Sequence, residues 1–229
     1  MAKDFERTWQ SKLAHSIDTS ASNKVRQKVL LGGAHLSDQS PRSDIIAWSR
    51  CAISELEYSV PLETAELILT ECACRYPSEA LQPIREIYLQ RGDIAEVHGM
   101  LQSRFRDFLV DTLALDETEI ATILDQGWGL AGLREGKTIL ATKIPKSGYL
   151  KEYLQEEDPQ RRREMYCHCP RVREAIKLNA SLPKTYCHCG AGFYKDIWET
   201  ILDAPVQVEV RSSVLQGDEV CTIAIYLPD

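Results

Sequence analysis

Apolar positions in the first 126 residues recur with the spacing of helices. Phe5, Trp9, Leu13 and Ile17 follow one another at four-residue intervals, which places all four on one stripe of a helix. Prolines and aspartates near the starts of later apolar runs mark further helix boundaries. We expect these further helices over residues 23–31, 43–59, 62–74, 78–91, 94–113 and 117–125.

The pattern changes after residue 126. Four glycines fall within ten residues, and the run Arg134-Glu135-Gly136-Lys137 is a turn signal. Residues 138–144 then form the first convincing strand pattern, and we expect them to be one arm of a hairpin that begins near Leu130. Helices are expected over residues 149–164, 170–178 and 190–202.

The closing segment has the clearest strand pattern. Valines alternate with polar side chains over residues 206–210, which is typical of a strand with one wet face. Gly217-Asp218 supplies a turn, and residues 220–226 return as the partner strand. We therefore predict an α+β fold, with a helical N-terminal region (1–126) packed on a C-terminal module (127–229). That module has an antiparallel sheet of about four or five strands and flanking helices.

Composition and charge narrow the classes of partner. The formal net charge is −7, whereas nucleic-acid binding favours a basic surface, so we expect no nucleic-acid partner. Residues 161–163, Arg171 and Arg173 form one local basic cluster, which we interpret as a solvated helix face, with an anion contact as the alternative. The first residues lack the apolar segment of a signal peptide, and no apolar run approaches the roughly 18 residues of a membrane span. We expect a cytoplasmic protein with no membrane partner.

The cysteines are clustered. Six of the eight form three Cys-x-Cys pairs: Cys72/Cys74, Cys167/Cys169 and Cys187/Cys189. The last two pairs belong to two copies of one tetrapeptide, Tyr-Cys-His-Cys, at residues 166–169 and 186–189. In a reducing compartment such clusters indicate metal binding, thiol chemistry or plain burial, and these alternatives stay open.

A metal site is one of these alternatives. In an extended Cys-x-Cys both thiols project to the same face, and zinc accepts four thiolates at about 2.3 Å. The expected ligands are Cys167, Cys169, Cys187 and Cys189, with Cys221 in reserve. Zinc is the first candidate metal and an iron–sulfur cluster the second, and the absence of any cofactor stays open.

Thiol catalysis is another alternative. Cys187 and Cys189 stand just before the helix expected over residues 190–202. Amides and the dipole at a helix N-terminus favour a thiolate, so either cysteine could act as a nucleophile. His15, His35 and His98 have no partners nearby in sequence, and we assign them no role.

Several short motifs extend these observations into a family resemblance. They are Cys-His-Cys-Pro at residues 167–170, Tyr-Cys-His-Cys-Gly-Ala-Gly-Phe-Tyr at 186–194, Trp198-Glu199, Pro205-Val206-x-Val208-Glu209, and Ser213-Val214-x-x-Gly217-Asp218-x-x-Cys221. Over residues 125–227 the chain resembles an uncharacterised prokaryotic family, similar to 4-vinyl reductase domains and to 2-aminothiazoline-4-carboxylate hydrolase-like proteins.

The resemblance implies a small-molecule-binding module with an apolar pocket between helices and an antiparallel sheet. Some 4-vinyl reductase domains hold zinc with a glutamate and three cysteines, and Cys187 and Cys221 look like two of those sulfurs. The third falls at Ser213, and serine is a poor zinc ligand. The hydrolase relatives imply thiol or ring-opening chemistry on a small heterocycle.

We therefore expect a small-molecule binding or sensing protein with a pocket beside the cysteine cluster. The expected ligand is a small apolar or heterocyclic molecule, and the expected lining residues are Trp128, Phe193, Tyr194 and Trp198. The alternatives are a thiol- or zinc-dependent hydrolase and a scaffold with structural zinc. A homodimer is left open.

Overall fold

The computed structural model describes residues 4–228, which fall into two compact units. Residues 4–74 and 167–192 form the first unit. Residues 75–166 and 193–228 form the second. The domain division expected after residue 126 stays a prediction.

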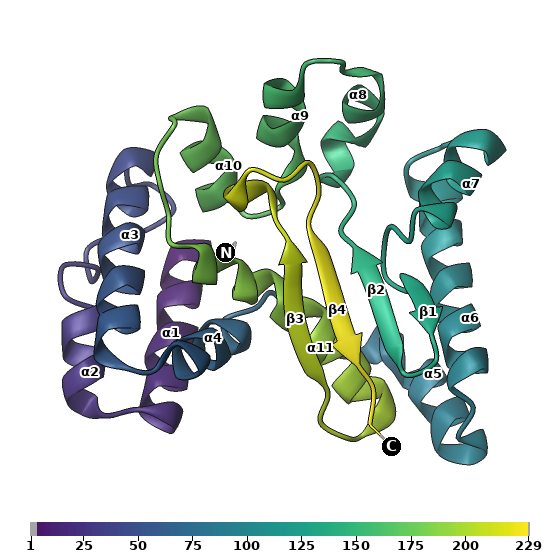
Figure 1. Cartoon of the computed structure of the whole chain (residues 1–229), viewed down its shortest axis with the longest axis horizontal. Helices are drawn as coiled ribbons and strands as arrows, with labels where there is room; N and C mark the ends of the chain where they lie inside the picture. The colour runs from purple at the N-terminus through teal and green to yellow at the C-terminus, as the bar shows by residue number, and fades with distance from the viewer. Residues whose placement is uncertain (1–3, 229) are drawn as a thin grey trace. The chain divides into compact units, whose positions relative to one another are not determined.

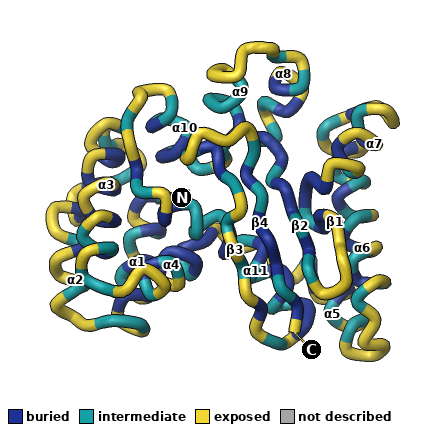
Figure 2. Tube along the Cα trace, viewed as in Figure 1, coloured by how far each residue is buried: buried dark blue, intermediate teal, exposed yellow. Residues whose placement is uncertain are grey.

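The first unit is helical (Figure 1). Its elements are α1 (Phe5–Ser20), α2 (Asn23–Val29), α3 (Arg42–Ser59), α4 (Leu62–Glu71), α10 (Pro170–Lys177), the 3-10 turn η3 (Lys184–Cys187) and the start of α11 (His188–Leu202). Asp4 caps α1 by accepting a hydrogen bond from the backbone N–H of Arg7. Trp9, Leu13 and Ile17 are buried, which confirms the apolar stripe of α1 (Figure 2).

Gly192 allows α11 to lie against the end of α4. A Cβ at this position would lie 1.9 Å from the carbonyl oxygen of Thr70 and 2.8 Å from Cβ of Ala73. Because a backbone atom blocks that space, any side chain would push the two helices apart. The glycine is therefore required by the close approach rather than by its backbone angles.

The second unit contains an antiparallel sheet with helices around it (Figure 1). Its strands are β1 (Leu133–Glu135), β2 (Thr138–Thr142), β3 (Gln207–Ser212) and β4 (Thr222–Tyr226), in the order β1-β2-β4-β3. Its helical elements are α5 (Ser78–Arg91), α6 (Ile94–Asp107), η1 (Phe108–Thr112), α7 (Glu117–Asp125), η2 (Ser147–Tyr149), α8 (Leu150–Gln155), α9 (Pro159–Tyr166), η4 (Val214–Gln216) and the rest of α11. The α+β class is confirmed.

The pairing of the closing strands is confirmed as well. Val208 pairs with Ile225 and Val210 with Ile223, and a register shift follows between Val210 and Ser212. Ile223 and Ile225 are buried, so β4 forms the core strand of this pair. The valines of β3 are half-buried, and the polar residues between them are exposed, as the alternation predicts.

The β1–β2 hairpin is held in shape by two glycines. Gly136 opens the tight turn with φ of 60°, a conformation that glycine adopts without strain. At Gly132 a Cβ would lie 2.6 Å from the carbonyl oxygen of Leu140, so this glycine lets β1 pair closely with β2. The predicted turn is confirmed at Gly136 and Lys137, while Arg134 and Glu135 belong to β1.

Three helix boundaries differ in how well sequence predicted them. Asp116 forms a complete capping box with Glu119, and α7 spans the predicted residues. The helix expected over 94–113 ends at Asp107 and continues as a π-helical turn to Thr112. The start predicted for the helix at 190 is wrong, because α11 begins at His188 directly after η3. Within the described part of the chain, no helix has both the length and the apolar character of a membrane span.

Candidate functional site

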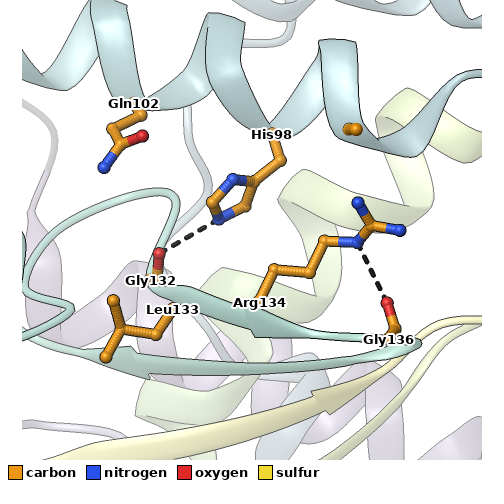
Figure 3. A pocket seen from close by; sticks show the side chains of 7 residues that line it. His98, Gln102, Gly132, Leu133, Arg134 and Gly136 are labelled. Carbon is orange, nitrogen blue, oxygen red and sulfur yellow. Dashed lines mark hydrogen bonds between the residues drawn. The ribbon is translucent and has the colours of Figure 1, made fainter.

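A surface hollow of about 370 Å³ lies in the second unit, between α6 and the β1–β2 hairpin (Figure 3). We call it the α6 hollow. Its lining residues are Ala95, His98, Gln102, Gly132, Leu133, Arg134 and Gly136. Ala95, His98 and Gln102 face the hairpin because spacings of three and four residues place side chains on one face of a helix.

His98 joins the helix to the hairpin. Its Nε2 lies 3.0 Å from the carbonyl oxygen of Gly132. A carbonyl can only accept, so Nε2 carries the hydrogen of this bond. The partner of His98 lies 34 residues away in the chain, where the local sequence does not point to it.

Arg134 supplies the charge of the hollow. Its Nε donates to the carbonyl oxygen of Gly136 at 2.9 Å, which holds the guanidinium beside the turn (Figure 3). The lining carries this one positive side chain and no carboxylate. The chain as a whole has a net charge of −7, so the charge of the hollow is opposite to that of the chain.

In the first unit, the two tetrapeptide copies meet in a chain of hydrogen bonds. Nη1 of Arg171 donates to the hydroxyl of Tyr186 at 3.2 Å. The Tyr186 hydroxyl lies 3.1 Å from Sγ of Cys169. Arginine can only donate, so the hydroxyl accepts from Arg171, while either the hydroxyl or the thiol supplies the hydrogen of the second contact. Cys169 of the first copy is therefore hydrogen-bonded to Tyr186 of the second.

Arg171 is fully buried and ion-paired. It contacts the carboxylate of Glu6, which is equally buried and also bound by Nη1 of Arg42 at 2.8 Å. Its guanidinium lies 4.0 Å from the centre of the Trp9 ring, within the range of a cation–π contact. Burial disfavours its charge, yet Tyr186 and Glu6 raise the pKa of the guanidinium above its ordinary value. The interpretation of Arg171 as part of a solvated basic face is wrong.

Other residues of the second copy are anchored to α4 and to the residue that follows it. Nδ1 of His188 lies 3.1 Å from the carbonyl oxygen of Thr185, and its Nε2 lies 3.7 Å from the Glu66 carboxylate. Sγ of Cys189 lies 3.5 Å from the carbonyl oxygen of Cys72. Because Cys187 ends η3 and Cys189 lies in the first turn of α11, the pair is not extended. Residues two apart on a helix point to different sides.

Tyr166 of the first copy belongs to the second unit, where it contacts Cys221. The backbone N–H of Cys221 donates to the Tyr166 hydroxyl at 3.0 Å, and this hydroxyl donates to the carbonyl oxygen of Lys143. Sγ of Cys221 accepts from the backbone N–H of Val214 at 3.4 Å. Burial raises the pKa of the Cys221 thiol and also that of the Tyr166 hydroxyl.

The aromatic residues expected to line a pocket lie in the second unit. Tyr194 and Trp198 are buried in the core, and the Tyr194 hydroxyl donates to the carbonyl oxygen of Gly129 at 3.1 Å. Trp128 is 7% exposed and packs edge-on against Tyr153. Phe193 is half-buried, with the ammonium of Lys143 5.5 Å from its ring centre. Their role as ligand-lining residues stays a prediction.

The expected metal ligands are distributed over both units. Cys167, Cys169, Cys187 and Cys189 belong to the first unit, and Cys221 belongs to the second. Over residues 4–228, no three His, Cys, Asp or Glu side chains are grouped so as to hold a metal ion. The assignment of these cysteines as metal ligands stays a prediction, as does the role of Cys187 and Cys189 in catalysis.

The C-terminal third of the chain has a counterpart in a known family. Residues 154–229 are similar to a family of unknown function (DUF6144). The matched segment holds both tetrapeptide copies and Cys221, and it includes neither Glu6 nor the α6 hollow. No curated protein and no solved structure matches the chain. The resemblance to 4-vinyl reductase domains stays a prediction.

Sequence reasoning missed the residues that most define these sites. One local feature indicates that Arg171 is buried: it lies on the same face of α10 as Val172 and Ala175, which are buried too. Glu6 lies in the first turn of a helix, where a carboxylate is common and carries no special meaning. His98, Gln102 and Arg134 come from a helix and a hairpin whose packing the sequence does not specify.

Proposed function

We propose that the protein binds a small molecule in the α6 hollow. The observation that carries this proposal is the hollow itself, whose volume of about 370 Å³ lies within the range of small-molecule sites. Ala95 and Leu133 give it apolar surface, while His98, Gln102 and Arg134 offer polar groups. This mixture suits a small ring with polar substituents, in keeping with the heterocyclic ligand expected from sequence.

The walls of the hollow come from regular elements. His98 fixes the distance between α6 and β1 through Gly132, and Arg134 is held by Gly136. A site built on a helix and a hairpin has its polar groups in place before a ligand arrives, which lowers the entropic cost of binding. This rigidity favours recognition of one shape over loose adsorption.

The test is a screen of small heterocycles followed by amide chemical shifts. We expect ligands to shift the resonances of Ala95, His98, Gln102 and Gly132. Ala95→Trp should fill the hollow and abolish these shifts. Ala121→Trp, at an exposed position of α7 in the same unit, should leave them unchanged. Ligand shifts that survive Ala95→Trp would place binding elsewhere.

A second candidate function is thiol chemistry at Cys169. The observation in its favour is the hydrogen bond between Cys169 and Tyr186, whose hydroxyl also accepts from Arg171. This bond holds the sulfur in one position, and the sulfur of a cysteine is the atom that reacts in thiol chemistry. Cys169 is half-exposed, so a reagent can reach it.

This candidate is tested by alkylation with iodoacetamide, mapped by peptide mass spectrometry. We expect Cys169 to react faster in the native protein than in Tyr186→Phe, by about tenfold if the bond is worth about 1.4 kcal/mol. Exposed Cys51 serves as the internal control, since its rate should be equal in both proteins. Equal rates at Cys169 would remove the basis for a nucleophilic role.

A further inference from the structure

We infer that the α6 hollow recognises an anionic group, a carboxylate or a phosphate, with Arg134 as the residue that binds it. This inference rests on the proposed function, because it names the chemical class of the ligand for the same site. It is carried by the charge of the lining, the orientation of Arg134 and the hydrogen-bonding capacity of its neighbours.

Arg134 is oriented for such a contact. Its guanidinium has five N–H groups, and Nε uses one of them on the Gly136 carbonyl oxygen. The two terminal nitrogens keep four N–H groups in a planar fork, a geometry that fits the two oxygens of a carboxylate or phosphate. The main-chain anchor also reduces the side-chain entropy that would be lost on binding.

The rest of the lining suits an anion. It contains no carboxylate that would compete for the guanidinium or repel the ligand. Gln102 brings a side-chain amide, whose NH₂ is a further donor, and it projects from α6 beside His98 (Figure 3). Glu135, next to Arg134 in β1, is not among the lining residues.

The neighbouring apolar surface defines the remainder of the ligand. Ala95 lines the hollow from α6, whereas the Leu133 side chain points away from that of Arg134, because neighbouring residues of a strand project to opposite faces (Figure 3). Ala95 therefore offers apolar surface to a flat body whose acidic group reaches the arginine. The class of ligand is therefore a small acid with a ring or short alkyl body.

The experiment compares benzoate with benzamide, which has the same ring but no charge. Amide chemical shifts of the lining residues are followed in the full chain at low ionic strength, where the ion pair is least screened. We expect benzoate to bind at least tenfold more tightly than benzamide. Arg134→Gln should remove that difference, and Arg134→Lys should keep part of it, because lysine retains the charge without the fork.

A matched control is available in the same sheet. Arg211 is an exposed arginine on β3, at the opposite edge from β1, so Arg211→Gln makes an equal change of charge away from the hollow. This variant should bind benzoate as the native protein does. Loss of benzoate binding in Arg211→Gln would mean that overall charge, and not Arg134, attracts the anion.

The outcomes separate the two proposals. If benzoate and benzamide shift the lining residues equally and Arg134→Gln changes neither, the anion inference is wrong while binding in the hollow stands. If benzoate at about 10 mM, enough to detect an affinity near −3 kcal/mol, shifts none of the lining residues, the anion inference is also wrong. In that second case the heterocycle screen with Ala95→Trp still decides whether the hollow binds small molecules at all.

Discussion

The two tyrosines of the repeated tetrapeptide are buried in different ways. Tyr186, in the first unit, lies between two side chains, the Arg171 guanidinium and the Cys169 thiol. Tyr166, in the second unit, lies between two main-chain groups, the N–H of Cys221 and the carbonyl of Lys143. Identical tetrapeptides therefore serve a side-chain ion network in one unit and a main-chain link in the other. The surroundings decide the role of the motif.

The largest expected effect comes from breaking the ion network of Tyr186. Arg171→Met leaves the buried Glu6 with only its contact to Arg42, and loss of one partner of a buried pair costs about 3–5 kcal/mol. We expect the free energy of unfolding to fall by about that amount, measured by urea unfolding with circular dichroism. A loss below about 1 kcal/mol would show that the network contributes little to stability.

A double variant sharpens this result. In Glu6→Met/Arg171→Met both buried charges are replaced by apolar side chains, which is often neutral for stability. We expect it to recover most of the loss seen in Arg171→Met. Failure to recover would mean that Arg171 acts mainly through its contacts with Trp9 and Tyr186.

A smaller effect is expected at the main-chain link. Tyr166→Phe leaves a buried N–H at Cys221 and a buried carbonyl at Lys143 without this partner, at a cost of about 1–3 kcal/mol. Unlike the Arg171 pair, these groups belong to the backbone, so no second substitution can remove them. The same urea measurement checks the loss. An unchanged free energy of unfolding would show that water replaces the hydroxyl.

The smallest expected effect is a pH dependence that compares one buried thiol from each unit. Burial raises the pKa of Cys72 well above its ordinary value and raises that of Cys221 as well. Above about pH 8.5 an unfolded thiol has lost its proton while the folded one keeps it. The free energy of unfolding should therefore fall as pH rises, by up to about 1.4 kcal/mol per pH unit for each thiol.

The variants Cys72→Ala and Cys221→Ala isolate these two contributions. Each should flatten the decline of stability between about pH 8 and 9, and Cys72→Ala should flatten it more. Slopes are compared rather than absolute values, because each variant also loses packing. The buried tyrosines have raised pKa values too, so the window stays below the region where unfolded tyrosines titrate. If a variant's free energy of unfolding falls with pH as steeply as that of the native protein, the replaced thiol does not contribute to the pH dependence.

Local chemistry made much of the fold predictable from the sequence. The capping aspartate at 116, the turn at Gly136 and the alternation over residues 206–210 each act within a few residues. Such signals place an element without knowledge of its neighbours, and the pairing of β3 with β4 follows from the turn between them.

The candidate sites were much less predictable because they join distant parts of the chain. Arg171 and Glu6 are 165 residues apart, and His98 and Gly132 are 34 apart. In the second tetrapeptide, the prediction of projecting thiols assumed an extended backbone, whereas η3 runs directly into α11. One turn of helix changes the direction in which each cysteine points, and no spacing rule within four residues reveals that turn.

The edges of the small sheet have a consequence for how copies of this chain behave at high concentration. An unprotected edge strand offers its N–H and C=O groups to another chain and promotes aggregation. At one edge β1 has only three residues, all exposed. At the other, β3 exposes Gln207, Glu209 and Arg211 and has a register shift near its end. A short strand on one side and a charged, irregular one on the other make poor templates, so the sheet should resist growth by strand addition.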